Sequence, residues 1–296
     1  MYTELFKLFG FGSEEIESER PRIDKAFKIL GIGSEDIKRG EKRVREFFDI
    51  ELLGVRKILG AWMRELIDLV LAKEEGKKVF YGNFPAPQLP YIAAQFACKN
   101  AWIGMPELVL DMAMGQVFDK LSPILEAAEQ HGMPPGLAQC SLSQCHVGGI
   151  VKGIVPVPDL LLTSAYLCDQ APKADEMLHE IYGVPVQYMD GCVDEAYGGW
   201  PIPQRTILYL GQEIREGLER FSEITGFEVT DENKHDALVS SARYFSEIRG
   251  IEELMMNDPM PLSSVDWSLF WWIEAMCFGN MKSVMDAIKT LREELK

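Results

Sequence analysis

The segment Pro158-Asp-Leu-Leu-Leu-Thr-Ser-Ala-Tyr-Leu-Cys168-Asp169 decides the fold class of this chain. Its apolar run predicts a short strand at residues 159–164 that is buried on both faces, as the strands of parallel sheets are. A helix is predicted directly afterwards, at residues 171–182. Three further segments have a comparable pattern and are predicted as strands: residues 78–81, 137–140 and 184–188. This alternation predicts an α/β fold with a doubly wound, Rossmann-like parallel sheet.

Helical regions flank the predicted sheet in the sequence. We expect an N-terminal helical region at residues 1–75, the Rossmann-like α/β domain with the candidate metal-binding cysteines at residues 76–200, and a C-terminal helical region at residues 201–296. Helical periodicity supports the outer regions. It is found at residues 47–71, 204–224 and 231–249, and a further helix is predicted inside the domain at residues 107–130.

A short glycine pattern occurs twice in the N-terminal region. Gly10-Phe-Gly12-Ser13 returns as Gly31-Ile-Gly33-Ser34. Each copy predicts that one helix ends at the glycines and that the next begins with the serine as its N-cap and acidic residues in its first turn. No strand precedes either copy and the third glycine is missing, so neither is a dinucleotide-binding fingerprint.

The composition excludes several classes of function. Among the 296 residues, 46 acidic and 30 basic side chains give a formal net charge of −16. Since no basic stripe offsets this charge, general nucleic-acid binding is not expected. No apolar run reaches the roughly 20 residues that span a bilayer, and the first residues lack the pattern of a signal peptide. Six cysteines are too few for a disulfide scaffold in a chain of this length, which favours a cytoplasmic protein with reduced thiols.

Motifs of three common enzyme classes are missing from the sequence. It contains no G-x-x-x-x-G-K-[ST] loop, no complete G-x-G-x-x-G after a strand and no G-x-S-x-G elbow. We therefore do not expect the chain to hydrolyse ATP, to bind NAD in the Rossmann manner or to act as a serine hydrolase.

Cys140 and Cys168 each stand where a short buried strand is expected to end. Such strand ends line the crevice of α/β folds, and two thiolates that converge there are the beginning of a metal or iron–sulfur site. His146 lies close by in the sequence and is a candidate catalytic proton donor. The pattern leaves alternatives open, because a free cysteine is also a common core residue and a histidine can be satisfied by packing or by solvent.

These residues together resemble the 2-hydroxyacyl-CoA dehydratase and benzoyl-CoA reductase family. The resemblance rests first on Cys140-x4-Cys145-x2-Gly148, on Pro158-Asp-Leu-Leu-Leu and on Cys168-Asp169. Three more segments fit in their order and spacing: residues 76–94, 184–190 and 224–249. The resemblance covers residues 76–280.

The resemblance implies doubly wound α/β domains and a [4Fe–4S] cluster in a subunit that assembles with a related partner subunit. It also implies a separate ATP-hydrolysing activator that supplies one low-potential electron for an acyl-CoA substrate. Radical elimination of a 2-hydroxyl group, or reduction of an aromatic ring, follows in an oxygen-sensitive enzyme. Cys140 and Cys168 match the family's cluster cysteines, and Cys145 matches a position that is cysteine in some relatives. The Cys-x4-Cys spacing is more similar to the reductase branch.

Some positions depart from the family pattern. Asn83 stands where many relatives have a cysteine, and Leu89 stands where a glutamate often follows the proline. The second α/β domain, which usually supplies the third cluster cysteine, is not evident in this sequence. The third ligand therefore stays open between Cys145, Cys192, Cys277 and a source outside the chain. These departures favour a second hypothesis, a non-catalytic scaffold or electron-transfer subunit that supports a catalytic partner.

Overall fold

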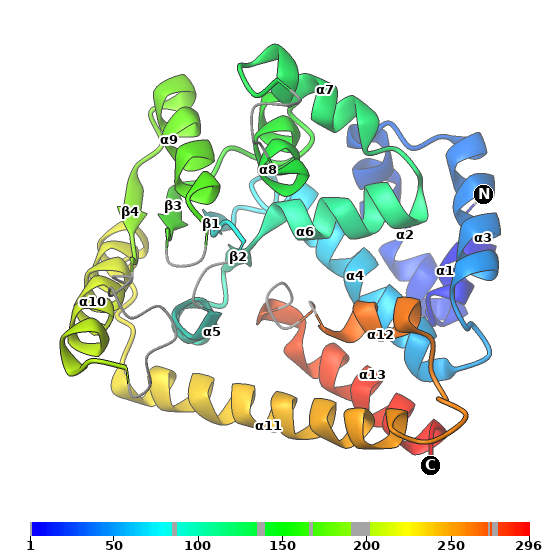
Figure 1. Cartoon of the computed structure of the whole chain (residues 1–296). Helices are drawn as coiled ribbons and strands as arrows, with labels where there is room; N and C mark the ends of the chain where they lie inside the picture. The colour runs from blue at the N-terminus through cyan, green and yellow to red at the C-terminus, as the bar shows by residue number, and fades with distance from the viewer. Residues whose placement is uncertain are drawn as a thin grey trace. The chain divides into compact units, whose positions relative to one another are not determined.

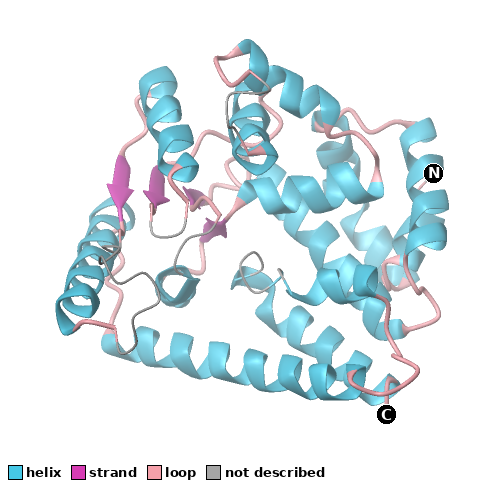
Figure 2. Cartoon of the chain, viewed as in Figure 1, coloured by secondary structure: helices cyan, strands magenta, loops and turns pink. Residues whose placement is uncertain are grey.

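The computed structural model of the chain forms two compact units. It describes residues 2–84, 88–134, 140–165, 168–190, 202–271, 273 and 278–296. The first unit is built from Met1–Leu71, Leu108–Leu121 and Val239–Lys296, and the second from Ala72–Glu107 and Ser122–Leu238. The strands of the described residues all belong to the second unit (Figure 2). The division into three regions at residues 75 and 200 stays a prediction.

Four short strands of the second unit form one parallel sheet. The strands are β1 (Lys78–Tyr81), β2 (Ala101–Gly104), β3 (Leu160–Thr163) and β4 (Val186–Tyr188). Their order is β2-β1-β3-β4, and each neighbouring pair is parallel, with Phe80 opposite Leu160 and Leu161 opposite Val186. The α/β class and the parallel sheet that the sequence predicts are confirmed.

Three of the four predicted strands are present close to their expected positions, as β1, β3 and β4. The predicted strand at residues 137–140 falls mostly on residues 135–139, which lie outside the described residues. The sequence does not predict β2. Its Ala101-Trp-Ile-Gly104 run is fully buried, but four apolar residues are too few to distinguish a strand from a helix by periodicity.

The strand order reverses at β1. From β1 the chain runs to β2 on one side, and it later adds β3 and β4 on the other side. The carboxyl ends of β1 and β3 therefore lie side by side, at the kind of position where open α/β sheets bind ligands. Helix α5 (Gln88–Ala97) connects β1 to β2, and α9 (Gln170–Tyr182) connects β3 to β4 (Figure 1). Helix α9 confirms the helix predicted at residues 171–182.

The connection from β2 to β3 contains four helical segments. They are α6 (Pro106–Leu110), the π-helix η1 (Asp111–Val117), α7 (Ser122–Gln130) and α8 (Ser141–Val151). Residues 107–117 and 122–130 are helical as predicted, and residues 118–121 interrupt the helical structure. Asp119 has a φ of 53°, which a right-handed helix does not allow, and α7 begins three residues later.

Helix α8 packs closely on α7 within the second unit. A Cβ atom on Gly148 of α8 would lie 2.0 Å from the carbonyl oxygen of Ile124 on α7. Only glycine allows this approach, because a side chain of any size would meet the backbone of the neighbouring helix. The glycine therefore helps to fix where α8 lies beside α7.

Helix α10 (Gln204–Thr225) packs on β4 and α5 in the second unit. Phe221 of α10 contacts Phe80 of β1 with ring centroids 4.7 Å apart. The hydroxyl of Tyr91 on α5 donates a hydrogen bond of 2.7 Å to the Leu162 carbonyl of β3. Helix α10 is part of the second unit.

The first unit is helical. It contains η1 and most of α6, together with α1 (Thr3–Leu8), α2 (Ser13–Ile29), α3 (Ser34–Phe47), α4 (Leu53–Leu71), most of α11 (Asp231–Met255), α12 (Ser264–Trp271), the short η3 (Phe278–Asn280) and α13 (Met281–Glu294). Helix α4 is buried over most of its length and packs on α13, where a Cβ atom on Gly54 would lie 2.5 Å from Leu291. Among the described residues, no helix has the length and apolar character that crossing a membrane requires.

The helix boundaries of the first unit differ from the predicted ones in two respects. The helix that is predicted to begin at residue 47 begins at Leu53, as α4. Phe47 is instead the last residue of α3. Gly12 and Gly33 are the N-caps of α2 and α3, and the serines that follow them are the first helical residues. The Gly33 N–H donates a hydrogen bond of 2.8 Å to Asp36 Oδ2, so a carboxylate of the first turn does the capping that the sequence assigns to a serine.

Candidate functional site

Cys140 and Cys168 lie at the starts of two neighbouring helices of the second unit. Cys140 is the exposed N-cap of α8, and Cys168 is a half-buried residue two positions before α9. The Cys140 backbone N–H donates a hydrogen bond of 2.6 Å to Oε1 of Gln170, the first residue of α9. This bond joins the two helix starts, so the structure brings the two cysteine-bearing segments together.

The helix starts provide a suitable setting for negatively charged ligands. The N-terminal turns of α8 and α9 carry backbone N–H groups without helical partners and the positive ends of the helix dipoles. Cys168 follows the carboxyl end of β3, beside the reversal of the strand order.

Cys145 has a different environment. It is buried on α8, and its Sγ lies 3.7 Å from the Glu107 carbonyl oxygen, to which the thiol donates. Five residues of α-helix turn a side chain by about 140° relative to the first. The structure therefore does not bring Cys145 to the side of α8 that carries Cys140.

The described part of the chain contains no group of three or more His, Cys, Asp or Glu side chains arranged to hold a metal ion. Cys192 and Cys277, the other candidates for a third ligand, lie outside the described residues. The four described cysteines, which include Cys98, are free thiols.

His146 lies on α8 between two carboxylates and is fully buried. Its Nδ1 is 2.8 Å from Glu107 Oε2 and its Nε2 is 3.0 Å from Asp175 Oδ1, on α9. Burial alone lowers the pKa of this imidazole, but its contacts with Asp175 and Glu107, and their charges, outweigh burial and raise the pKa to about 10. His146 is therefore an imidazolium at neutral pH.

Glu107 and Asn83 connect this buried group to the end of β1. Glu107 Oε1 accepts a hydrogen bond of 2.6 Å from the Phe84 N–H. Asn83 is fully buried, and its Nδ2 donates to the Ala171 carbonyl on α9 at 3.1 Å. Asn83, which stands where relatives carry a cysteine, therefore joins the turn after β1 to α9.

The sequence reasoning does not identify Glu107 or Asp175. For Asp175 a signal exists, because it lies on the same stripe of α9 as the buried Ala171, Ala174 and Leu178. A carboxylate on an apolar stripe needs a buried partner. For Glu107, which follows a proline at a helix start, the sequence shows no sign of burial.

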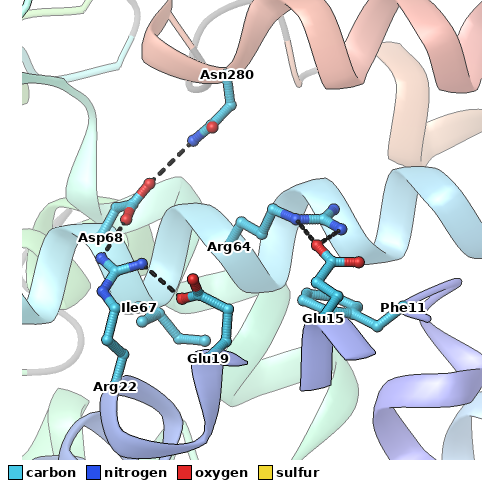
Figure 3. Close-up of a pocket in the computed structure, with 8 residues that line it drawn as sticks. All are labelled: Phe11, Glu15, Glu19, Arg22, Arg64, Ile67, Asp68 and Asn280. Carbon is cyan, nitrogen blue, oxygen red and sulfur yellow. Dashed lines mark hydrogen bonds and ion pairs between the residues drawn. The ribbon is translucent and has the colours of Figure 1, made fainter. Parts of the chain in front are cut away.

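A small pocket in the first unit has a different character (Figure 3). Arg22 binds Glu19 and Asp68, and Arg64 binds Glu15, so each guanidinium in the pocket already has a carboxylate partner. We therefore place the candidate functional site at the starts of α8 and α9.

Comparison with known proteins identifies the family of the chain. No curated protein matches the chain significantly. The family described as 2-hydroxyglutaryl-CoA dehydratase, D-component, matches residues 91–296, which is more than two thirds of the chain. The matched region includes both helix starts with Cys140 and Cys168, and also the buried group around His146. The chain therefore belongs to the 2-hydroxyglutaryl-CoA dehydratase D-component family.

Proposed function

We propose that the chain is a subunit of an iron–sulfur enzyme that acts on acyl-CoA thioesters. The observation that carries the proposal is the hydrogen bond between Cys140 and Gln170, because it places two cysteines of the family-matched region at adjoining helix starts. The strand order supports a doubly wound sheet, with these helix starts beside its ligand-binding crevice.

Cys140 and Cys168 would hold a [4Fe–4S] cluster, which supplies one low-potential electron and, at an open iron, a Lewis acid for a hydroxyl or carbonyl oxygen. Cys145 faces Glu107 inside the protein, so we propose a packing role for it. The third ligand then comes from Cys192, from Cys277 or from another chain. Free thiols at all described cysteines support a reducing, cytoplasmic setting.

His146 holds a proton and does not transfer it, in our proposal. Its side chain is fully buried and both ring nitrogens face carboxylates, so no atom of the ring is available to a substrate. We therefore assign His146 to the support of the site, and not to the catalytic step for which the sequence makes it a candidate.

The family description favours dehydration of a 2-hydroxyacyl-CoA as the reaction. We propose that the chain works with a partner subunit and receives its electron from a separate ATP-hydrolysing activator, as the family resemblance implies. The sequence contains no phosphate-binding loop of its own. Reduction of an aromatic acyl-CoA is the second candidate reaction, which the Cys140-x4-Cys145 spacing favours.

A non-catalytic scaffold or electron-transfer subunit is the alternative function. Two observations favour it: the described residues provide two suitably placed thiols and no third ligand, and Asn83 is engaged in a buried hydrogen bond. In that case a partner subunit would carry out the reaction.

An anaerobic assay with co-purified partner subunit and activator tests the proposal. With 2-hydroxyglutaryl-CoA, ATP and a low-potential reductant, we expect loss of water, followed as the enoyl-CoA by mass spectrometry. Cys168→Ala should abolish turnover, whereas the matched control Cys98→Ala, at a buried thiol after α5, should retain it. Full turnover by Cys168→Ala would show that this chain is a scaffold.

A further inference from the structure

We propose that Gln170, His146 and Asp175 are positioning residues that set the spacing between the thiols of Cys140 and Cys168. The inference rests on the proposed function for what the two thiols hold. The spacing itself follows from the contacts between α8 and α9, whatever the ligand is.

Two contacts join α8 and α9 at different depths. At the helix starts, the Cys140 N–H binds Gln170 Oε1 at 2.6 Å. In the interior, His146 Nε2 lies 3.0 Å from Asp175 Oδ1. His146 is six residues after Cys140 and Asp175 is five after Gln170, so the second contact lies about 8 Å further along the helices. A single contact would allow α9 to rotate about that point relative to α8, whereas two contacts fix both the separation and the angle of the two helices.

The same buried group ties both helices to the sheet. Glu107 binds His146 of α8 through one carboxylate oxygen and the Phe84 N–H after β1 through the other. Asn83, also after β1, binds the Ala171 carbonyl of α9. The middle of α8 and the start of α9 are therefore both tied to the carboxyl end of β1.

Asp175 makes the interior contact sensitive to substitution. Apart from the ion pair with His146, neither carboxylate oxygen of Asp175 has a hydrogen-bond partner within the described residues, and the side chain is fully buried. A buried charge without its partner is strongly unfavourable. The ion pair between His146 and Asp175 therefore holds α8 and α9 together. Removal of the Asp175 carboxylate leaves α9 without this anchor.

The distance between the two thiols can be tested in the absence of a cluster with a reagent that reacts with two thiols at once. Phenylarsine oxide bridges two nearby thiols: two S–H bonds are broken, two As–S bonds form and one water is released. We would treat the iron-free full chain anaerobically and identify the bridged cysteines by peptide mass spectrometry. We expect the wild type to bridge Cys140 with Cys168. The rate should fall roughly tenfold in Asp175→Ala, because a buried contact is lost. It should fall about threefold in Gln170→Ala, because the hydrogen bond to the Cys140 N–H is lost.

Two variants separate positioning from a general loss of stability. Asp175→Asn keeps a side chain of the same size with an oxygen beside His146 Nε2 but removes the charge, so it should recover part of the wild-type rate. Glu180→Gln removes an exposed charge near the C-terminal end of the same helix, away from Cys168, and should not change the rate. Circular dichroism establishes that each variant is folded.

Equal rates in the wild type, Asp175→Ala and Gln170→Ala overturn the inference. If Asp175→Ala does not fold, the half-buried Gln170→Ala decides: an unchanged rate overturns the inference and a slower one supports it. If the wild type bridges the thiols, the variants do so more slowly and yet no form takes up iron, the positioning role stands and the proposed function fails. If the wild type does not bridge Cys140 with Cys168, the inference fails, whatever the iron content.

Discussion

The buried imidazolium of His146 makes the stability of the protein depend on pH in a specific direction. The pKa of His146 is raised from 6.5 to about 10 in the folded chain. Because the folded state binds this proton more tightly, its contribution is complete below pH 6.5 and is lost as the pH rises through the folded pKa. At about 1.4 kcal/mol for each pH unit, the whole contribution is about 5 kcal/mol, of which about 3 kcal/mol is lost between pH 7 and 9.

Urea unfolding at a series of pH values measures this dependence. The free energy of unfolding of the wild type should fall steadily from pH 7 to 9. Asp175→Asn removes one of the two negative charges beside the ring, so its curve should fall by roughly half as much over the same range. His235→Gln, at an exposed histidine, is the matched control and should follow the wild type.

The informative quantity is the difference between the variant and the wild type in how far the free energy of unfolding falls with pH. Burial also raises the pKa of Cys98, which destabilises the folded state at high pH in every one of these proteins. Nitrogen chemical shifts of His146 give a direct reading of its protonation. Parallel curves for the wild type and Asp175→Asn, with a neutral His146 at pH 8, would refute the reasoning.

Three further substitutions have definite expected outcomes. Gly148→Ala should destabilise the protein by about 1–3 kcal/mol in urea unfolding, because the new methyl group meets the Ile124 carbonyl; an unchanged midpoint would contradict the close packing of α7 and α8. Tyr91→Phe should cost about 1–2 kcal/mol by the same measurement, since the buried Leu162 carbonyl loses its donor. Cys145→Ala should lower stability by on the order of 1 kcal/mol and leave the iron content unchanged, and loss of iron would make Cys145 a ligand after all.

The parts of the fold that the sequence predicts correctly are those with a strong local signal. The Leu160–Thr163 strand is a continuous apolar run, and α9 has helical periodicity with Gly183 at its left-handed end. Strand β2 has only four residues, and the break after η1 depends on the backbone of Asp119, so neither has a comparable signal.

The candidate site was predictable to a different extent. The position of Cys168 follows from local pattern, since it lies between a predicted strand and a predicted helix that are both present. The strand that is predicted to end at Cys140 lies mostly outside the described residues. The group around His146 depends on contacts between distant segments: Glu107 is 39 residues away from His146 in the chain. A single sequence shows which residues can ionise, but it does not show which of them become buried together.

Iron and acid-labile sulfide in the anaerobically purified protein, with the EPR spectrum of the dithionite-reduced form, test the central claim most directly. We predict about four iron and four sulfide per chain, and their loss in Cys140→Ala and in Cys168→Ala but not in Cys98→Ala. Protein without iron in the presence of its partner subunit, or full iron content in both Cys140→Ala and Cys168→Ala, would contradict the claim that these two thiols hold a cluster.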